Sequence, residues 1–284
     1  MASLREIKDR IGSVRSTLKI TGAMKLVASA KLRKAQAAAG AMLPYEQTLE
    51  GILSRVAAAS GGKVPDLRVP SEEDRAQGRT AVVVIASNSS LCGSFNANVI
   101  RAALGVLSGE GECDVFALGR KASEALRKAG YASAGDYNDL VARPSFEKAA
   151  GLASALADAY REGRYDKVVL VHNHFISSAV QKPVVESFLP FGWEMEDGAV
   201  QTDAILEPSA GELLSALVPK VLEVKMYAAL LDSVASEHAA RTVAMQTATD
   251  NAEDLLSDLT LEYNKGRQQK ITSEILDLLG GKAE

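Results

Sequence analysis

Two histidines are the residues most suggestive of metal chemistry. His172 and His174 lie two apart at the end of a predicted strand, so both side chains could point to one side of a sheet as ligands. Two nitrogens are too few for a metal site, and no matching cysteine or carboxylate cluster stands near them in the sequence. The third histidine, His238, belongs to a helical pattern. We therefore expect no metal.

The turns after two predicted strands could hold an anion or a substrate. The segment SNSSLCGSFN, residues 87–96, follows the first strand, where a doubly wound sheet usually binds its ligand. Gly119, Arg120 and Lys121 follow the second strand and place two cations at a helix start. Neither segment contains GxGxxG or GxxxxGKS/T, and Cys92 has no catalytic partner in the sequence. We expect no cofactor and no small-molecule substrate, and an anion site after the second strand stays open.

The middle of the chain has the pattern of a Rossmann-like α/β domain, which we place at residues 79–207. Short apolar runs rich in β-branched residues alternate with helical patterns, as in βαβ units with a mostly parallel sheet. In chain order these runs and patterns occupy residues 80–87, 95–108, 113–119, 120–130, 146–163 and 166–175. Residues 183–191 and 204–208 could add one or two further strands.

The C-terminal segment, residues 208–284, predicts a long helix with a coiled-coil seam. From Lys220 to Leu279 the sequence has no proline and one glycine, which indicates a single helix of about 90 Å. An unbroken 3-4 spacing runs through Leu217, Val221, Val224, Ala228, Leu231, Ala235, His238, Thr242, Met245, Thr249, Ala252, Leu256, Leu259 and Tyr263. Small and polar residues make this seam narrow, so they either fix its register or face a partner.

The N-terminal segment, residues 1–60, repeats the 3-4 spacing. The residues are Leu4, Ile7, Ile11, Val14 and Leu18. We therefore predict that the two ends of the chain form an antiparallel two-helix coiled coil, with residues 61–78 as a linker to the α/β domain. The first 40 residues hold nine Lys or Arg against two acids, whereas residues 241–284 hold five against eight, so the two ends attract each other.

Two details of this coil are open to a structural test. After Leu18 the apolar positions move to Ile20, Met24 and Val27, which predicts a phase change that locally unwinds the supercoil. Pro44 and Gly51 should weaken the first helix near its end. If Leu217 pairs with the end of the first helix near Thr48, the antiparallel register places Leu4 opposite about Leu261.

In that register the C-terminal helix is longer than its partner. The apolar residues Ile271, Ile275, Leu278 and Leu279 then form a stripe with no partner helix in the same chain. An unpaired apolar tip of this kind indicates a socket in another protein.

Composition excludes several classes of protein. The formal charge of −4 shows no basic excess of the kind that indicates nucleic-acid binding, and two cysteines provide no disulfide framework. No stretch approaches the roughly 18 apolar residues of a membrane span. The first residues lack the apolar core of a signal peptide, and we expect a protein that is soluble or peripheral to a membrane.

The two ends of the chain resemble a known family. The runs IKDRIGSVRSTLKITGAMKLVASAKLRKA and SEHAARTVAMQTATDNAEDLLSDLTLEYNKGRQQKITSEILDLLGG are similar to the two signatures of the gamma subunit of F-type ATP synthase. The segments LEVKMYAALLDSVASEH and LCGSFN resemble weaker internal ones. The resemblance spans essentially the whole chain, and its terminal motifs are long and specific.

The resemblance implies a non-catalytic rotor shaft. In the family the coiled coil stands inside a ring of alpha and beta subunits, and the α/β domain and the epsilon subunit rest on the membrane c-ring. Ion flow turns the ring and the shaft, which couples ion flow to ATP synthesis or hydrolysis. For this chain the expected location is the cytoplasmic face of the bacterial inner membrane, where the protein is peripheral.

The resemblance also implies partner contacts for single residues. Met24 in ITGAMK and Arg241 in SEHAAR match places where the shaft meets the moving lobes of the beta subunits. Arg267, Gln268 and Thr272 in RQQKIT match its contact with a beta loop. The tip residues Ile275, Leu278 and Leu279 resemble those that sit in an apolar collar.

The chain departs from the family pattern at two places. Residues 88–90 read Asn-Ser-Ser where relatives usually carry a charged Asp-Arg-Gly, and Thr242 stands where a Met is usual. A second class of function therefore stays open at this point: an α/β ligand-binding or enzyme domain that carries a coiled-coil arm for RNA or protein. Its only support is the basic N-terminal helix.

Overall fold

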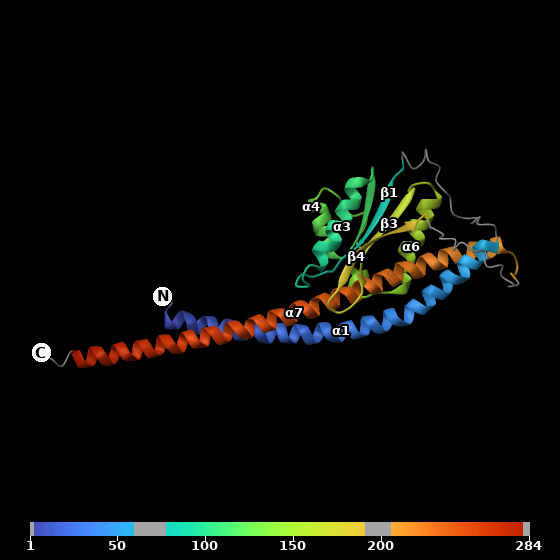
Figure 1. Cartoon of the computed structure of the whole chain (residues 1–284). Helices are drawn as coiled ribbons and strands as arrows, with labels where there is room; N and C mark the ends of the chain where they lie inside the picture. The colour runs from blue at the N-terminus through green and yellow to red at the C-terminus, as the bar shows by residue number, and fades with distance from the viewer. Residues whose placement is uncertain (1–2, 60–77, 191–205, 281–284) are drawn as a thin grey trace.

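The computed structural model describes residues 3–59, 78–190 and 206–280, and two long helices dominate it. Helix α1 spans Leu4–Ala59 and helix α7 spans Ala210–Gly280, with 56 and 71 residues. They run antiparallel and side by side, both chain ends lie at the same end of the coil, and an α/β domain packs against the other half (Figure 1). This arrangement confirms the predicted fold class.

The predicted seam of α7 faces inward along its whole length. None of its fourteen residues is exposed, and the buried ones include Val221, Leu231 and Leu259. Two hydrogen bonds join the helices midway along the coil. Thr249 Oγ1 donates to Thr21 Oγ1 at 2.9 Å, and Lys25 Nζ donates to Gln246 Oε1 at 2.8 Å.

The predicted register of the coil is wrong by five residues. Leu4 lies against Gly266 rather than Leu261: a Cβ added at Gly266 would stand 3.0 Å from Leu4 Cδ2. The reason lies at the other end of α1, which continues through Pro44 and Gly51. Its last turns bury Leu53 and Val56 in a core cluster that also includes Leu214 and, at its edge, Leu217.

The predicted phase change after Leu18 is also wrong. The seam of α1 continues at the same spacing through Thr21, Ala28, Leu32 and Ala35, all of which are buried. Ile20 and Val27 point outward and are 59% and 57% exposed. Small and hydroxyl-bearing residues occupy the seam here because the two backbones approach closely, as the Thr21–Thr249 hydrogen bond shows.

The α/β domain is built on a four-stranded sheet with the order β2-β1-β3-β4. Its strands are β1 (Thr80–Ile85), β2 (Cys113–Leu118), β3 (Lys167–Phe175) and β4 (Gln181–Leu189). The first three strands are parallel, and β4 pairs with β3 in the antiparallel sense. Strand β4 is the first of the two further strands that the sequence suggested. The described part of the second, residues 206–208, forms no strand.

Both faces of the sheet are covered, which is why its strands are continuous apolar runs. Helices α3 (Phe95–Gly109) and α4 (Arg120–Lys128) cover the face that carries Val82, Val84 and Val169. Helix α6 (Phe146–Arg161), the short α5 (Asn138–Ala142) and α7 cover the opposite face. One face therefore packs directly against the coiled coil. Among the described residues, no helix is long and apolar enough to cross a membrane.

Candidate functional site

Both strand histidines lie near carboxylates, but only His174 is within hydrogen-bond distance of one. His172 is buried, and its Nε2 lies 3.6 Å from Glu186 Oε1. His174 Nδ1 lies 2.7 Å from Asp232 Oδ2. The part of the chain that the structure describes contains no group of three or more His, Cys, Asp or Glu side chains that could hold a metal ion. The His174–Asp232 contact joins the sheet to α7, whereas His172 and Glu186 both lie within the sheet, on β3 and β4.

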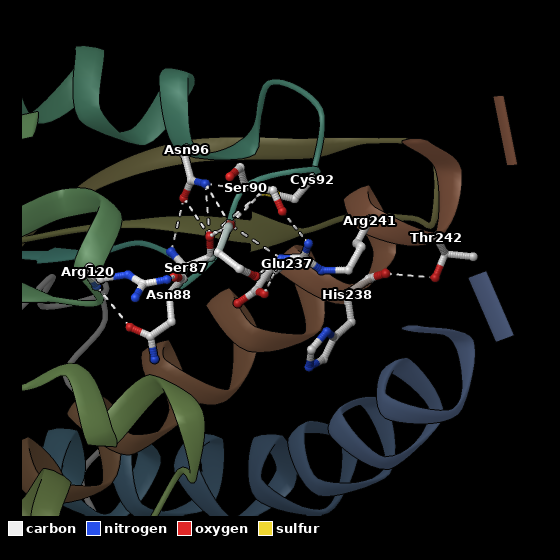
Figure 2. Close-up of polar contacts among 11 residues, drawn as sticks. Ser87, Asn88, Ser90, Cys92, Asn96, Arg120, Glu237, His238, Arg241 and Thr242 are labelled. Carbon is white, nitrogen blue, oxygen red and sulfur yellow. Dashed lines mark hydrogen bonds and ion pairs between the residues drawn. The ribbon is translucent and has the colours of Figure 1, made fainter. Parts of the chain in front are cut away.

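The turn at the start of α4 already has its amides occupied. The backbone nitrogen of Arg120 donates to Asn88 Oδ1 at 2.9 Å (Figure 2). The backbone nitrogen of Lys121 donates to the Ser87 carbonyl at 3.1 Å. Gly119 has a φ of 101°, and a side chain there would collide with the Ala86 carbonyl. The geometry therefore favours an ordinary strand-to-helix turn over an anion site.

Cys92 is buried in the loop after β1. Desolvation on burial raises the pKa of its thiol, and hydrogen bonding by Ser87 opposes this only in part. The thiol therefore stays protonated near neutral pH and is a poor nucleophile. It packs with Phe95 and Ala240, which makes it a structural contact between the loop and α7.

Arg241 forms the centre of a polar network that joins this loop to α7. Its guanidinium donates to the carbonyl of Ser90, to Ser89 Oγ at 2.8 Å and to Glu237 Oε1 at 2.7 Å (Figure 2). The Arg241 and Glu237 side chains are each 10% exposed. The loop side of the network is held by Asn96, whose Oδ1 accepts from Ser87 N and Oγ at 3.0 Å. We call these six residues the Arg241 network.

One turn earlier on α7, more polar side chains bind the ends of β1 and β3. Asp232 Oδ1 accepts from the Phe175 amide at 3.0 Å. Ser236 Oγ donates to the Asn173 carbonyl at 3.1 Å, and Ser233 Oγ donates to the Ile85 carbonyl at 3.5 Å. Sequence reasoning missed this polar stripe. Its 3-4 spacing from Ser233 to Arg241, beside the seam, is a signal that could have identified it.

The predicted partner residues fall into two environments. Arg241 is buried inside the chain's own network, and Met24 is half-buried at the side of the coil. The predicted contacts near the C-terminus are all exposed on α7, beyond the point where α1 begins: Arg267, Gln268, Thr272, Ile275 and Leu278. The side chain of Leu279 lies outside the described residues. Partner contact at each of these positions stays a prediction.

Exposed apolar residues on the coil were not predicted as a group. Leu26 is 68% exposed beside Ile20 and Val27 on α1, and Leu261 is 66% exposed on α7. Beyond α1, Ile275 is 51% and Leu278 is 73% exposed on the free part of α7. A coil whose outer surface carries this much apolar area is typical of a segment enclosed by other proteins.

Comparison with known sequences decides the family. A family model described as ATP synthase matches residues 3–283. An ATP synthase gamma chain of Phocaeicola vulgatus is 48% identical over 290 residues, which cover 99% of each chain. The gamma chain of Flavobacterium johnsoniae is 42% identical over 285 residues, which cover 99% of this chain and 98% of the other. The chain belongs to the ATP synthase gamma chain family.

Solved structures with the same fold come from mitochondrial ATP synthases. A chain in the OSCP/F1/c-ring structure of Euglena gracilis in rotational state 3 aligns with a TM-score of 0.69 and 20% identity, covering 98% of this chain and 93% of that chain. A chain in the central stalk and c-ring structure of Tetrahymena thermophila has a TM-score of 0.57 and 24% identity, with 81% and 99% covered. The alignment with the Euglena gracilis chain extends over both the coil and the α/β domain of this chain.

Proposed function

We propose that this chain is the central rotor shaft of an F-type ATP synthase and has no chemistry of its own. It transmits rotation of the membrane c-ring to the catalytic beta subunits, and so couples ion flow to ATP synthesis or hydrolysis. The observation that carries the proposal is the overhang of α7 past Gly266, a single exposed helix on a coil whose family is that of ATP synthase gamma chains.

The geometry suits the transmission of torque. Torque applied to the α/β domain must reach the coil through the contacts between that domain and α7. The Arg241 network and the polar stripe provide directional hydrogen bonds there, and the Val83 face of the sheet adds apolar packing. Hydrogen bonds resist twisting better than apolar contacts alone, because a displacement of about 1 Å between donor and acceptor already breaks them.

The coil provides the surfaces for the catalytic ring. We infer that the tip residues Ile275, Leu278 and Leu279 sit in an apolar collar of the alpha and beta subunits. Arg267, with Gln268 and Thr272, offers hydrogen-bond donors to a loop of a beta subunit. Met24 and Arg241 lie closer to the moving lobes of the beta subunits, and the departures at Asn88 and Thr242 alter this region.

The opposite end of the molecule faces the membrane. We infer that the α/β domain binds the epsilon subunit and that its base, with the end of the coil near Ala59, rests on the c-ring. This places the chain at the cytoplasmic face of a bacterial inner membrane as a peripheral subunit.

Assembly tests the proposal directly. The full chain with a tag is expressed with the alpha and beta subunits of the same organism, and the purified material is assayed for composition, ATP hydrolysis and rotation of a bead fixed to the α/β domain. We expect a complex with one copy of the chain, in which the bead turns in one direction. Capture of RNA in place of alpha and beta subunits would instead support a ligand-binding domain with a coiled-coil arm.

A further inference from the structure

A cavity of about 450 Å³ lies where the coil meets the sheet. Helix α1 forms one wall with residues 36–46, α7 forms another with residues 225–235, and β3 and β4 close the third side. The lining is largely apolar and includes Ala39, Met42, Leu43, Phe175 and Ala228. It is separate from the Arg241 network and from the exposed tip.

His172 is a buried polar side chain on this cavity without a hydrogen-bond partner. It is 4% exposed, and neither Nδ1 nor Nε2 has a partner. The alternation of β3 directs its side chain to the face that carries Val168 and Leu170, which is the face covered by α7. The nearest carboxylate, Glu186, is 3.6 Å away, which is long for a hydrogen bond. A buried imidazole in this state is missing a partner.

The charges around the cavity are mostly acidic. Glu46 comes from α1, with Glu50 one turn on, Glu186 from β4 and Asp232 from α7. Lys225 is the only Lys or Arg among the lining residues. Asp232 is held by His174 and the Phe175 amide. The neighbouring imidazole of His172, followed by the charge of Lys225, lowers the pKa of Glu186, so this carboxylate stays charged. The three lining carboxylates outnumber the one lysine, which leaves negative charge beside apolar walls.

The pKa of Glu46 is raised by its burial and by the carboxylates around it. Desolvation on burial, followed by the negative charges of Glu50, Glu186 and Asp232, raises the pKa of Glu46 to about 7, and Lys225 opposes the shift only in part. The cavity would therefore gain stability from an additional positive charge. His172 could then accept a hydrogen bond from the same group through either ring nitrogen that is not protonated.

We propose that this cavity binds an organic cation, namely an ammonium or guanidinium group on a short apolar stem. The group is carried by a free amine or by a Lys or Arg side chain of a neighbouring subunit. Its charge lies between Glu46 and Glu186 within reach of His172, and its stem packs on Phe175 and Met42. This ligand site is independent of the role of the chain as a rotor shaft.

The first test is calorimetric titration of the full chain with benzylamine, and with benzyl alcohol as a neutral probe of nearly the same shape. Because a charge-assisted hydrogen bond is worth more than a neutral one, we expect benzylamine to bind about tenfold more tightly. Its affinity should fall from pH 8 to pH 6, because protons on Glu46 compete with the bound cation. Equal binding of the two probes, or no saturable binding of benzylamine, would overturn the proposal.

Variants locate the site and protect the test against misfolding. Glu186→Gln and Glu46→Gln should each weaken benzylamine binding about five- to tenfold, whereas Glu147→Gln, at an exposed position on α6, should leave it unchanged. Thermal melts identify any variant that fails to fold. If one of the two cavity variants is unfolded, the other is compared with Glu147→Gln. Unchanged affinity in a folded cavity variant contradicts the site.

Repeating the titration with the assembled complex distinguishes the two sources of the cation. Retained binding of benzylamine identifies a site for free amines. Binding that is present in the isolated chain and absent from the complex identifies a side chain of a neighbouring subunit in the same cavity.

Discussion

At the scale of single residues, the most informative side chain is Arg241. The family resemblance gives it a role toward partner subunits, yet in this chain its fork of donors is already shared between Glu237 and the loop after β1. Ser89 and Ser90, where the chain departs from the usual family pattern, are the acceptors on that loop. The Ser90 acceptor is a backbone carbonyl, which any residue offers, so at these two positions the departure contributes only the Ser89 hydroxyl to the network.

Replacement of Arg241 tests the network. Arg241→Ala leaves the Glu237 carboxylate buried without its partner, so we expect the free energy of unfolding to fall by about 3 kcal/mol. Urea denaturation followed by circular dichroism measures this change. Arg267→Ala removes the same side chain from an exposed position and should change stability by less than about 0.5 kcal/mol. Equal losses in the two variants would contradict the network.

His238 should make the stability of the chain depend on pH. Desolvation on burial, followed by the charges of Lys31 and Arg241, lowers its pKa to about 4. The unfolded chain then binds a proton that the folded chain does not, so stability is complete above about pH 6.5 and is lost as the pH falls toward 4. We expect His238→Gln to remove about 1 to 2 kcal/mol of the loss between pH 7.5 and pH 5. Urea titrations at both pH values measure this, and identical losses in both proteins would refute it.

At the scale of the elements, α7 carries three different surfaces. Its seam faces α1, its polar stripe at residues 232–241 faces the sheet, and beyond Gly266 every side chain that the structure describes is exposed. A helix of 71 residues can do this because its environment changes along its length. Because the described side chains of this free part are all exposed, we expect partner subunits to supply the contacts that stabilise it as a helix.

Changes at the tip should affect assembly and leave folding of the isolated chain intact. Ile275→Asp and Leu278→Asp alter side chains that are 51% and 73% exposed, so the free energy of unfolding should change by less than about 0.5 kcal/mol. In the complex each loses an apolar contact worth roughly 1.5 to 3 kcal/mol, and assembly yield or torque should fall in a graded way. Glu274→Gln is the control on the same turn. A tip variant that destabilises the isolated chain would contradict this role.

Met24 lies at the edge of the seam and tests coupling. It is half-buried next to the exposed apolar residues of α1, so Met24→Lys should place a cation at the surface of the coil while the chain still folds. A new ion pair of about 1 to 3 kcal/mol with a beta subunit at one angle would slow a step about five- to 150-fold. We expect ATP-driven ion pumping to fall more than ATP hydrolysis in the same membranes. Met24→Leu is the control, and proportional loss of both activities would make Met24 a structural residue.

At the scale of the whole molecule, the coil and the α/β domain are built to move as one body. The sheet packs directly on α7, and the hydrogen bonds between Thr21 and Thr249 and between Lys25 and Gln246 tie α1 to the same helix. The chain ends lie at one end of the coil, and the sheet lies toward the other (Figure 1). Rotation of the domain must therefore turn both helices together.

A cross-link between the helices tests this rigidity. In a background with Cys92→Ser and Cys113→Ser, Thr21→Cys with Thr249→Cys places two thiols where hydroxyl oxygens lie 2.9 Å apart, and mild oxidation should join them. We expect the oxidised complex to retain ATP hydrolysis and rotation within about twofold, because no sliding of α1 along α7 is required. Thr21→Cys with Thr247→Cys, whose second position is exposed, should not cross-link. Activity that is lost on oxidation and restored by reduction would show that the helices move relative to each other.

The sequence by itself determined the features that depend on local order along the chain. The 3-4 spacing of α7 predicted its seam, and β-branched runs between helical patterns predicted the three parallel strands of a Rossmann-like sheet. These predictions succeeded because the period of apolar residues records which face of an element is buried, whatever it packs against. The terminal motifs, from Ile7 to Ala35 and from Ser236 to Gly281, indicated the family for the same local reason.

Only the tertiary structure decided how distant segments meet. In the structure Leu4 lies beside Gly266, and Ile20 and Val27 point outward. Arg241 of α7 forms hydrogen bonds with the loop after β1. The middle of the seam, rich in Ala, Thr and His, has few large side chains to select one register. The pairing of polar groups depends on distances between residues more than a hundred positions apart. Those distances are set by the packing of the whole molecule, which the local pattern does not contain.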